Sequence, residues 1–204
     1  GTVTRIGQCA FANCDSLKSI SLPANLTEIA GIAFDGCESL KSVVIPSKVK
    51  TIGYAAFSGC SGLTSFEINS GVLEKTGSFI FYGCKNLKEV KLNGALKKIP
   101  EDMFANAHYL EKVIIPKSVT SIDSMSFYEC NSLKSIVIPE NVTYIGYSAF
   151  AGCAQLKSVV VPAKVNEIKW CAFEDCTALT SVTVKNKNVK FGVEVFRNDN
   201  NLTI

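Results

Sequence analysis

The sequence predicts a solenoid, a rod of stacked repeats that each add one short parallel β-strand to a common sheet. Two patterns predict it: a phenylalanine returns at a fixed spacing, and an alternating apolar segment returns with it. The phenylalanines are Phe11, Phe34, Phe57, Phe81, Phe104, Phe127, Phe150, Phe173 and Phe196. Successive members are 23 residues apart, except for one interval of 24. A fixed period of this length is typical of proteins whose repeats pack only on their neighbours.

We expect residues 1–204 to form a single solenoid domain of about nine repeats. Solenoids close their ends with atypical polar repeats, whereas the first repeat here has an ordinary sequence. The chain is therefore expected to be a fragment of a longer one.

Each repeat has a segment with the periodicity of a β-strand. Two apolar positions alternate with positions that face outward, as in a strand with one buried face. The apolar pairs are Ile20/Leu22, Val43/Ile45, Phe66/Ile68, Val90/Leu92, Val113/Ile115, Ile136/Ile138, Val159/Val161 and Val182/Val184. Strands that repeat in one direction predict a parallel sheet of eight strands, which we expect to form the concave face.

The second half of each repeat has a different spacing. Val142, Ile145, Ala149 and Cys153 follow one another at intervals of three or four residues, and Phe150 comes directly after Ala149. This spacing predicts short helical or 3₁₀ turns on the convex side, because too few residues remain for a full helix. The phenylalanine rings are expected to stack as a spine inside this wall.

Seven of the nine cysteines lie three residues after the repeating phenylalanine. They are Cys14, Cys37, Cys60, Cys84, Cys130, Cys153 and Cys176, while Ala107 and Asp199 fill the same position in two repeats. A column of cysteines with one alanine indicates a small buried slot that holds free thiols. In-register side chains have poor disulfide geometry, and a linear stack does not converge on a metal. We expect Asp199 to lie where this slot opens to water, as part of a partial cap on the last repeat.

Composition excludes several classes of function. A net charge of +3 is small for 204 residues and gives no electrostatic reason to expect nucleic-acid binding. No run of 18 apolar residues is present, so this fragment has no predicted membrane span, and the given sequence contains no signal peptide. The single histidine, His108, has no evident nucleophile or carboxylate partners, so we expect no enzyme, no cofactor and no metal site.

Residues 145–162 contain the pattern I-G-x-x-A-F-x-x-C-x-x-L-x-x-[IV]-x-[IV]-P, which recurs with small changes along the whole chain. This pattern resembles the BspA-like subclass of leucine-rich repeats, with repeats of 23 residues. The resemblance implies an α/β leucine-rich-repeat solenoid. It also implies a cell-surface or extracellular location and a role in adhesion or protein recognition, with no shared catalytic residues. The implied partner is a protein or glycoprotein on a host or neighbouring cell.

One candidate binding feature is a row of lysines that precedes the strands. It consists of Lys18, Lys41, Lys88, Lys134 and Lys157, and Glu111 interrupts it. The row could attract an acidic ligand. It could equally be a solvated border that discourages aggregation of strand edges.

A second candidate lies on the strands themselves, where Ile114, Val137 and Val160 share an outward-facing position in adjacent repeats. Exposed apolar patches often mark interaction sites, although β-branched residues suit any strand. Tyr147 and Trp170 also share one position, in the turn region, where they could bind a partner or cover the core.

The repeat pattern weakens at residues 69–107, where the fourth unit contains one extra residue. A tolerated loop insertion with local repacking and a bend or partner contact both explain this irregularity. The leading hypothesis for function is recognition of a host or cell-surface macromolecule through the concave sheet. The alternative is a structural spacer or self-associating segment of a larger surface protein.

Overall fold

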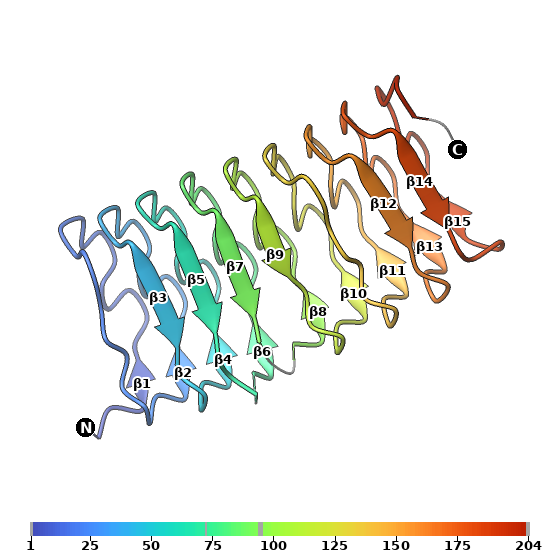
Figure 1. The fold of residues 1–204 in the computed structure, drawn as a ribbon. Coiled ribbons are helices and arrows are strands. Elements are labelled where there is room, and N and C mark those ends of the chain that lie inside the picture. Colours follow the sequence, from blue (N-terminus) through green and yellow to red (C-terminus); the bar gives the residue numbers. More distant parts are fainter. Residues whose placement is uncertain (1, 72, 94–95, 203–204) are drawn as a thin grey trace.

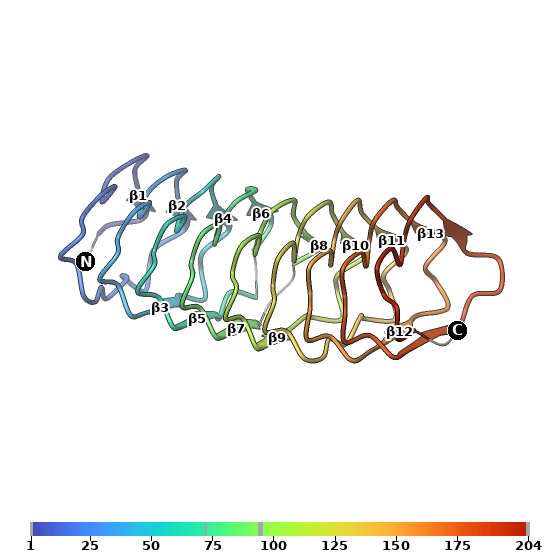
Figure 2. The same ribbon diagram turned by 90° about the horizontal axis from the view of Figure 1, so that it is seen from above.

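The computed structural model describes residues 2–71, 73–93 and 96–202. The chain winds into an elongated stack of coils, and the N-terminus and C-terminus lie at opposite ends (Figures 1 and 2). Each coil contributes to two walls of parallel strands that are joined by turns. This arrangement confirms the predicted parallel-strand solenoid.

The first wall contains the strands that the alternating pattern predicted, and we call its outer surface the long-strand face. Its strands are β3 (Ser42–Ile45), β5 (Ser65–Ile68), β7 (Glu89–Leu92), β9 (Lys112–Ile114), β12 (Ser158–Val161) and β14 (Ser181–Val184). They form two parallel sheets with the orders β3-β5-β7-β9 and β12-β14. Paired residues occupy equivalent positions in adjacent repeats; for example, Val43 lies opposite Phe66. Residues 19–22 and 135–138 occupy the same position in their repeats but are not strands, so six of the eight predicted strands are confirmed.

The second wall corrects the sequence analysis. Among the described residues there is no helix or 3₁₀ turn. Instead, this wall contains two-residue strands that pair in parallel. They are β1 (Arg5–Ile6), β2 (Glu28–Ile29), β4 (Thr51–Ile52), β6 (Lys75–Thr76), β8 (Lys98–Ile99), β10 (Ser121–Ile122), β11 (Tyr144–Ile145), β13 (Glu167–Ile168) and β15 (Lys190–Phe191).

Backbone geometry explains why the spacing of three and four residues does not produce helices here. Two positions in every repeat have a positive φ angle, one located two residues before the repeating phenylalanine and the other two residues after it. The first position has φ from 48° to 61° and the second from 57° to 75°. A left-handed residue cannot continue a right-handed helix. The chain therefore turns sharply twice around each phenylalanine.

The core between the walls is a continuous column of phenylalanine rings, as predicted. Neighbouring rings stack with centroids 5.0 to 5.7 Å apart, except for Phe57 and Phe81, whose centroids are 6.3 Å apart. Phe66 explains this exception, because its ring packs edge-on against both of them, at 4.9 and 4.6 Å. The irregular unit is therefore accommodated by local repacking inside the core.

The cysteine column is confirmed as a set of free thiols, and all nine cysteines are free. Six of these thiols are fully buried and lie 3.1 to 3.3 Å from the carbonyl oxygen of the phenylalanine 26 or 27 residues earlier, to which they donate a hydrogen bond. Cys14 is an exception to the predicted burial, since it is exposed in the first repeat. Burial raises the pKa of the Cys60 thiol to about 12 and raises that of Cys84 well above its ordinary value. These groups are consequently packing residues without nucleophilic reactivity.

The two walls are interrupted at different places. The short strands form the orders β1-β2-β4-β6 and β8-β10-β11-β13-β15, so their ladder stops at the irregular unit between β6 and β8. The long strands pair without a break through that unit and separate later, between β9 and β12. The second interruption falls in a repeat of ordinary sequence, residues 135–138.

Candidate functional site

The lysine row borders the long-strand face, and all its members are exposed. In the described part of the chain, no salt bridge includes Lys18, Lys41, Lys88, Lys134 or Lys157. Two threonines take the same position in other repeats. The hydroxyls of Thr64 and Thr180 donate hydrogen bonds to the carbonyl oxygens of Lys41 and Lys157, at 3.1 and 3.2 Å. The row thus presents ammonium groups that are available to an external anion.

Three apolar side chains stand out from the long-strand face next to this row. Ile114 is 45% exposed, Val137 is 81% exposed and Val160 is 47% exposed. We call these three residues the central patch. The main chains of Ile114 and Val160 lie in register with the neighbouring strands, since Ile114 pairs with Lys91 and Val160 pairs with Thr183. The predicted patch is therefore open to solvent, with its most exposed member in the middle.

In the middle of the patch, the main chain of residues 135–138 is not paired with the neighbouring strands. Among the described residues, no backbone hydrogen bond joins Ser135, Ile136, Val137 or Ile138 to β9 or β12. Just before this segment, the N–H of Lys157 still donates a hydrogen bond to the carbonyl oxygen of Lys134, at 3.3 Å. We call residues 135–138 and their two unpaired borders the central seam; in Figure 1 this segment lies between β9 and β12.

The opposite wall stays closed at the same level of the stack. There, β10 pairs with both β8 and β11, and the rings of Phe104, Phe127 and Phe150 stack at 5.0 and 5.1 Å. The seam is thus a break in the hydrogen-bond ladder of one wall, over an intact core in which Ile136 and Ile138 stay buried. The N–H and C=O groups of residues 135–138 have no backbone partner on β9 or β12, and water or a partner must satisfy them.

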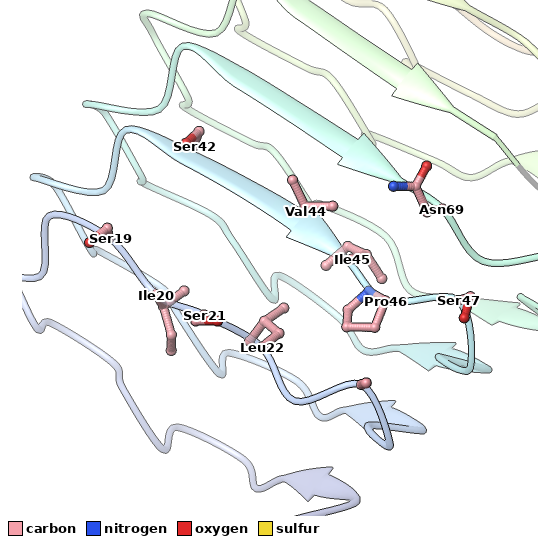
Figure 3. A pocket seen from close by; sticks show the side chains of 11 residues that line it. Ser19, Ile20, Ser21, Leu22, Ser42, Val44, Ile45, Pro46, Ser47 and Asn69 are labelled. Carbon is pink, nitrogen blue, oxygen red and sulfur yellow. The ribbon is translucent and has the colours of Figure 1, made fainter. Parts of the chain in front are cut away.

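A second interruption forms a hollow near the N-terminal end of the long-strand face. It has a volume of about 620 Å³ and lies between residues 19–22 and β3 (Figure 3). Ser19, Ser21, Ser42 and Val44 are among its lining residues. The N–H of Lys41 donates a hydrogen bond to the carbonyl oxygen of Lys18, at 3.2 Å. Residues 19–22, which follow Lys18, are not paired with β3. This hollow resembles the central seam in its lysines and serines, but among its described lining residues Val44 is the one large apolar side chain that is exposed.

The interruption of the short-strand wall forms another hollow, of about 410 Å³, on the other side of the molecule. Glu74, Lys75, Leu96, Lys97 and Lys98 line it. The ammonium group of Lys98 is 2.9 Å from the Asp123 carboxylate. This hollow lies where the ladder of short strands is interrupted between β6 and β8.

Tyr147 and Trp170 lie beside the short strands, away from the lysine row and the central patch. Both are exposed, with Trp170 at 57%, and their rings meet edge to face with centroids 6.5 Å apart. The Lys169 ammonium lies 5.9 Å from the centroid of Tyr144 and 5.7 Å from that of Tyr147. It is also 2.6 Å from a Glu167 carboxylate oxygen. The structure therefore does not bring these aromatic residues together with the other candidates.

Sequence reasoning missed a related aromatic cluster. Phe79 contacts both Tyr54 and Tyr82, with ring centroids 5.5 Å apart in each pair, and both tyrosines are exposed. Tyr54 occupies the same repeat position as Tyr147 and Trp170, a signal that could have revealed the cluster. Phe79 lies outside the register of the buried phenylalanines, so its position alone gave no indication.

Chemistry-bearing groups elsewhere have structural explanations. The Nδ1 atom of His108 lies 2.7 Å from the Asn131 side-chain oxygen and 3.0 Å from the Glu129 carbonyl oxygen. In the described ranges, no three His, Cys, Asp or Glu side chains are grouped so that they could hold a metal ion. The same ranges contain no helix long and apolar enough to cross a membrane.

Asp199 corrects the expectation for the last repeat. Its side chain occupies the cysteine slot but is only 7% exposed, and neither carboxylate oxygen has a hydrogen-bond partner among the residues that the structure describes. Burial raises its pKa to about 6. The slot is therefore not open to water at this position.

Comparison with solved structures finds bacterial leucine-rich-repeat proteins. A leucine-rich-repeat protein from Eubacterium ventriosum ATCC 27560 is 26% identical with a TM-score of 0.69, and the match covers 74% of this chain and 41% of that chain. A leucine-rich cell surface protein from Faecalibacterium prausnitzii A2-165 is 26% identical with a TM-score of 0.71, covering 98% and 70%. The leucine-rich-repeat protein of T. pallidum is 30% identical with a TM-score of 0.62, covering 91% and 78%. This chain thus spans less than half the length of the Eubacterium protein.

Comparison with curated protein sequences finds no match. The sequence profile of the BspA type leucine rich repeat region, in contrast, matches residues 1–109 and 74–203. These matches cover nearly the whole sequence, and the repeat geometry agrees with the solved relatives. The chain therefore belongs to the BspA-type leucine-rich-repeat family.

Proposed function

We propose that this chain is a surface or secreted recognition module that binds a protein or glycoprotein of a host or neighbouring cell through its long-strand face. The observation that carries the proposal is the central patch, where three exposed apolar residues lie beside lysines that form no ion pair within the described part of the chain. Apolar groups that stay exposed in the presence of an ample core are typical of interaction surfaces. The Faecalibacterium relative is described as a cell surface protein, which supports the proposed location.

Rigidity supports the same function. The phenylalanine column and the buried thiols fix each repeat against the next, so the long-strand face is already ordered before a partner arrives. Binding to a preformed surface costs less conformational entropy than binding that must order a loop. The fold is typical of non-enzymatic repeat scaffolds, and we propose no catalytic role.

Direct binding to a panel of extracellular-matrix glycoproteins, at low and physiological salt, tests this proposal. We expect saturable binding that weakens when Val137 is replaced by Asp. The matched control is Val193→Asp, since Val193 is an exposed valine beside the short strands. Equal loss in both variants, or no binding to any member of the panel, would contradict recognition through the long-strand face.

A structural role is the second candidate, and one observation favours it. A hollow of about 290 Å³ near the last strands is lined by apolar residues, including Val182, Val184, Phe191 and Phe196. Such a surface favours self-association. Sedimentation that shows mass rising with concentration, and falling in a Phe191→Ser variant, would support a self-associating segment.

A further inference from the structure

The central seam brings together three features that complement one kind of ligand. The central patch supplies apolar surface, Lys134 and Lys157 supply positive charge, and residues 135–138 supply unpaired main-chain groups. The inference below rests on the proposed function and specifies the chemistry of the partner.

The lysines and the apolar residues form two parallel rows. Lys134 and Val137 are three residues apart on one extended segment, which corresponds to about 10 Å. The equivalent pair one repeat later is Lys157 and Val160. Ser135 and Ser158 lie between the rows, and both are exposed. Because serine side chains are small, they leave a shallow floor between the charged row and the apolar row.

An extended peptide suits this geometry. Successive side chains of an extended chain point to opposite sides, so a peptide lying between the rows would turn alternate residues toward each row. The central patch covers two repeat spacings, also about 10 Å, a length that about three extended residues span. One set of side chains would meet the central patch and the other would meet the two ammonium groups.

We infer that the central seam binds an extended segment of a partner protein in which acidic and apolar residues alternate. The carboxylates lie between Lys134 and Lys157, and the apolar side chains pack on Val137 and its neighbours. The unpaired main-chain groups of residues 135–138 hydrogen-bond to the segment directly or through water. Charge complementarity selects the acidic residues, and the exposed valines select their apolar neighbours.

Glu111 gives the site a direction. It is exposed in the lysine row one repeat before Lys134 and repels an acidic side chain at that end. Lys112, which follows it, is already 3.5 Å from the Glu89 carboxylate. The acidic residues of the partner are therefore expected toward Lys157, and Glu111→Gln should tighten binding.

The N-terminal hollow supplies an internal comparison. Lys18 and Lys41 are consecutive members of the lysine row, like Lys134 and Lys157, and Ser19 and Ser42 follow them. In the position of Val137, however, this region has Ser21. A ligand that responds to charge alone, such as a sulfated polysaccharide, would use both lysine pairs. A peptide that also needs apolar contact would prefer the central seam.

The experiment is a fluorescence-anisotropy titration of residues 1–204 with a labelled octapeptide of alternating glutamate and valine. We expect saturable binding that weakens with salt. The double variant Lys134→Glu/Lys157→Glu should bind at least about tenfold more weakly. The matched double variant Lys18→Glu/Lys41→Glu should change affinity less than about twofold, because it has the same charge change far from the seam.

A peptide of alternating glutamate and serine should bind more weakly than the glutamate–valine peptide. The inference is overturned if the glutamate–valine peptide does not bind, or if both lysine pairs matter equally. It is also overturned if a sulfated oligosaccharide of the same charge binds as tightly as the peptide. If matrix glycoproteins still bind the Lys134→Glu/Lys157→Glu variant with unchanged affinity, this inference fails while the proposed function stands.

Discussion

The Sγ atom of Cys176 lies 3.2 Å from the carbonyl oxygen of Phe150, to which it donates a hydrogen bond. In the next repeat, Asp199 takes the position of that thiol and Phe173 takes the position of Phe150. A protonated carboxyl group could repeat the donation to the Phe173 carbonyl, whereas a carboxylate cannot donate. The same slot therefore accommodates aspartic acid well only in its neutral form.

This relationship predicts how stability depends on pH. The pKa of Asp199 is raised by burial from 3.8 to about 6 in the folded protein. The stabilising contribution of the neutral form is fully present below pH 3.8 and is lost as the pH rises through about 6. We expect Asp199→Cys to increase the free energy of unfolding at pH 7.5 by about 2 kcal/mol. Urea denaturation of both proteins at pH 4.5 and pH 7.5 measures the effect.

The matched control for this prediction is Asp15→Asn, because Asp15 is exposed. Its effect on the free energy of unfolding should be within about 0.5 kcal/mol at both pH values. A gain from Asp199→Cys that is as large at pH 4.5 as at pH 7.5 would show that the charge is not responsible.

Backbone strain predicts a different substitution. Gly83 has a φ of 68°, and a Cβ atom added there would meet no heavy atom within 4 Å. Gly83→Ala therefore tests backbone conformation without a steric clash, and we expect a loss of about 1 kcal/mol of stability. Gly83→Asn should cost less, because asparagine tolerates this conformation and occupies the same repeat position at Asn13, Asn106 and Asn198. Thermal denaturation of the two variants compares their losses of stability. Equal losses would contradict an explanation by the left-handed backbone conformation.

Much of the fold could be predicted because a repeat multiplies weak signals. One alternating pair such as Ile136 and Ile138 says little, but eight equivalent pairs define a column. The same argument located the phenylalanine spine and the buried thiols. It also placed Ile114, Val137 and Val160 on the exposed side, where the structure has them.

The short strands and the seam could not be predicted in this way. A two-residue strand such as Tyr144–Ile145 is too brief to show alternation, and the left-handed positions accept residues as different as Ile32 and Ser148. The seam falls in residues 135–138, whose sequence follows the repeat. The loss of strand pairing there depends on how neighbouring coils pack, which no single repeat encodes.

Burial predicts which thiols react. Cys9 and Cys14 are exposed, whereas Cys84 and Cys130 are fully buried and their pKa values are raised by burial. The thiolate is the reactive form, so buried thiols should be alkylated only on unfolding. Brief treatment of the native protein with iodoacetamide at pH 8, followed by peptide mass spectrometry, should find Cys9 and Cys14 modified first. Early modification of Cys84 would show that the column is open.

The central seam predicts unequal hydrogen exchange within the long-strand wall. Amides of residues 135–138 have no backbone partner on β9 or β12, whereas those of β5 and β7 are in a continuous parallel ladder. Amide exchange is fast where hydrogen bonds are absent or open easily. We therefore expect amides at 135–138 to exchange at least about tenfold faster than those of Ser65–Ile68, measured by mass spectrometry of overlapping peptides.

Residues 65–68 are a suitable reference because they occupy the same repeat position and have the same alternation of buried and outward side chains. Similar protection in both segments would mean that the seam is closed in solution. Fast exchange at 135–138 that slows when the glutamate–valine peptide is added would place that peptide at the seam. Unchanged exchange at saturating peptide would locate its binding elsewhere on the protein.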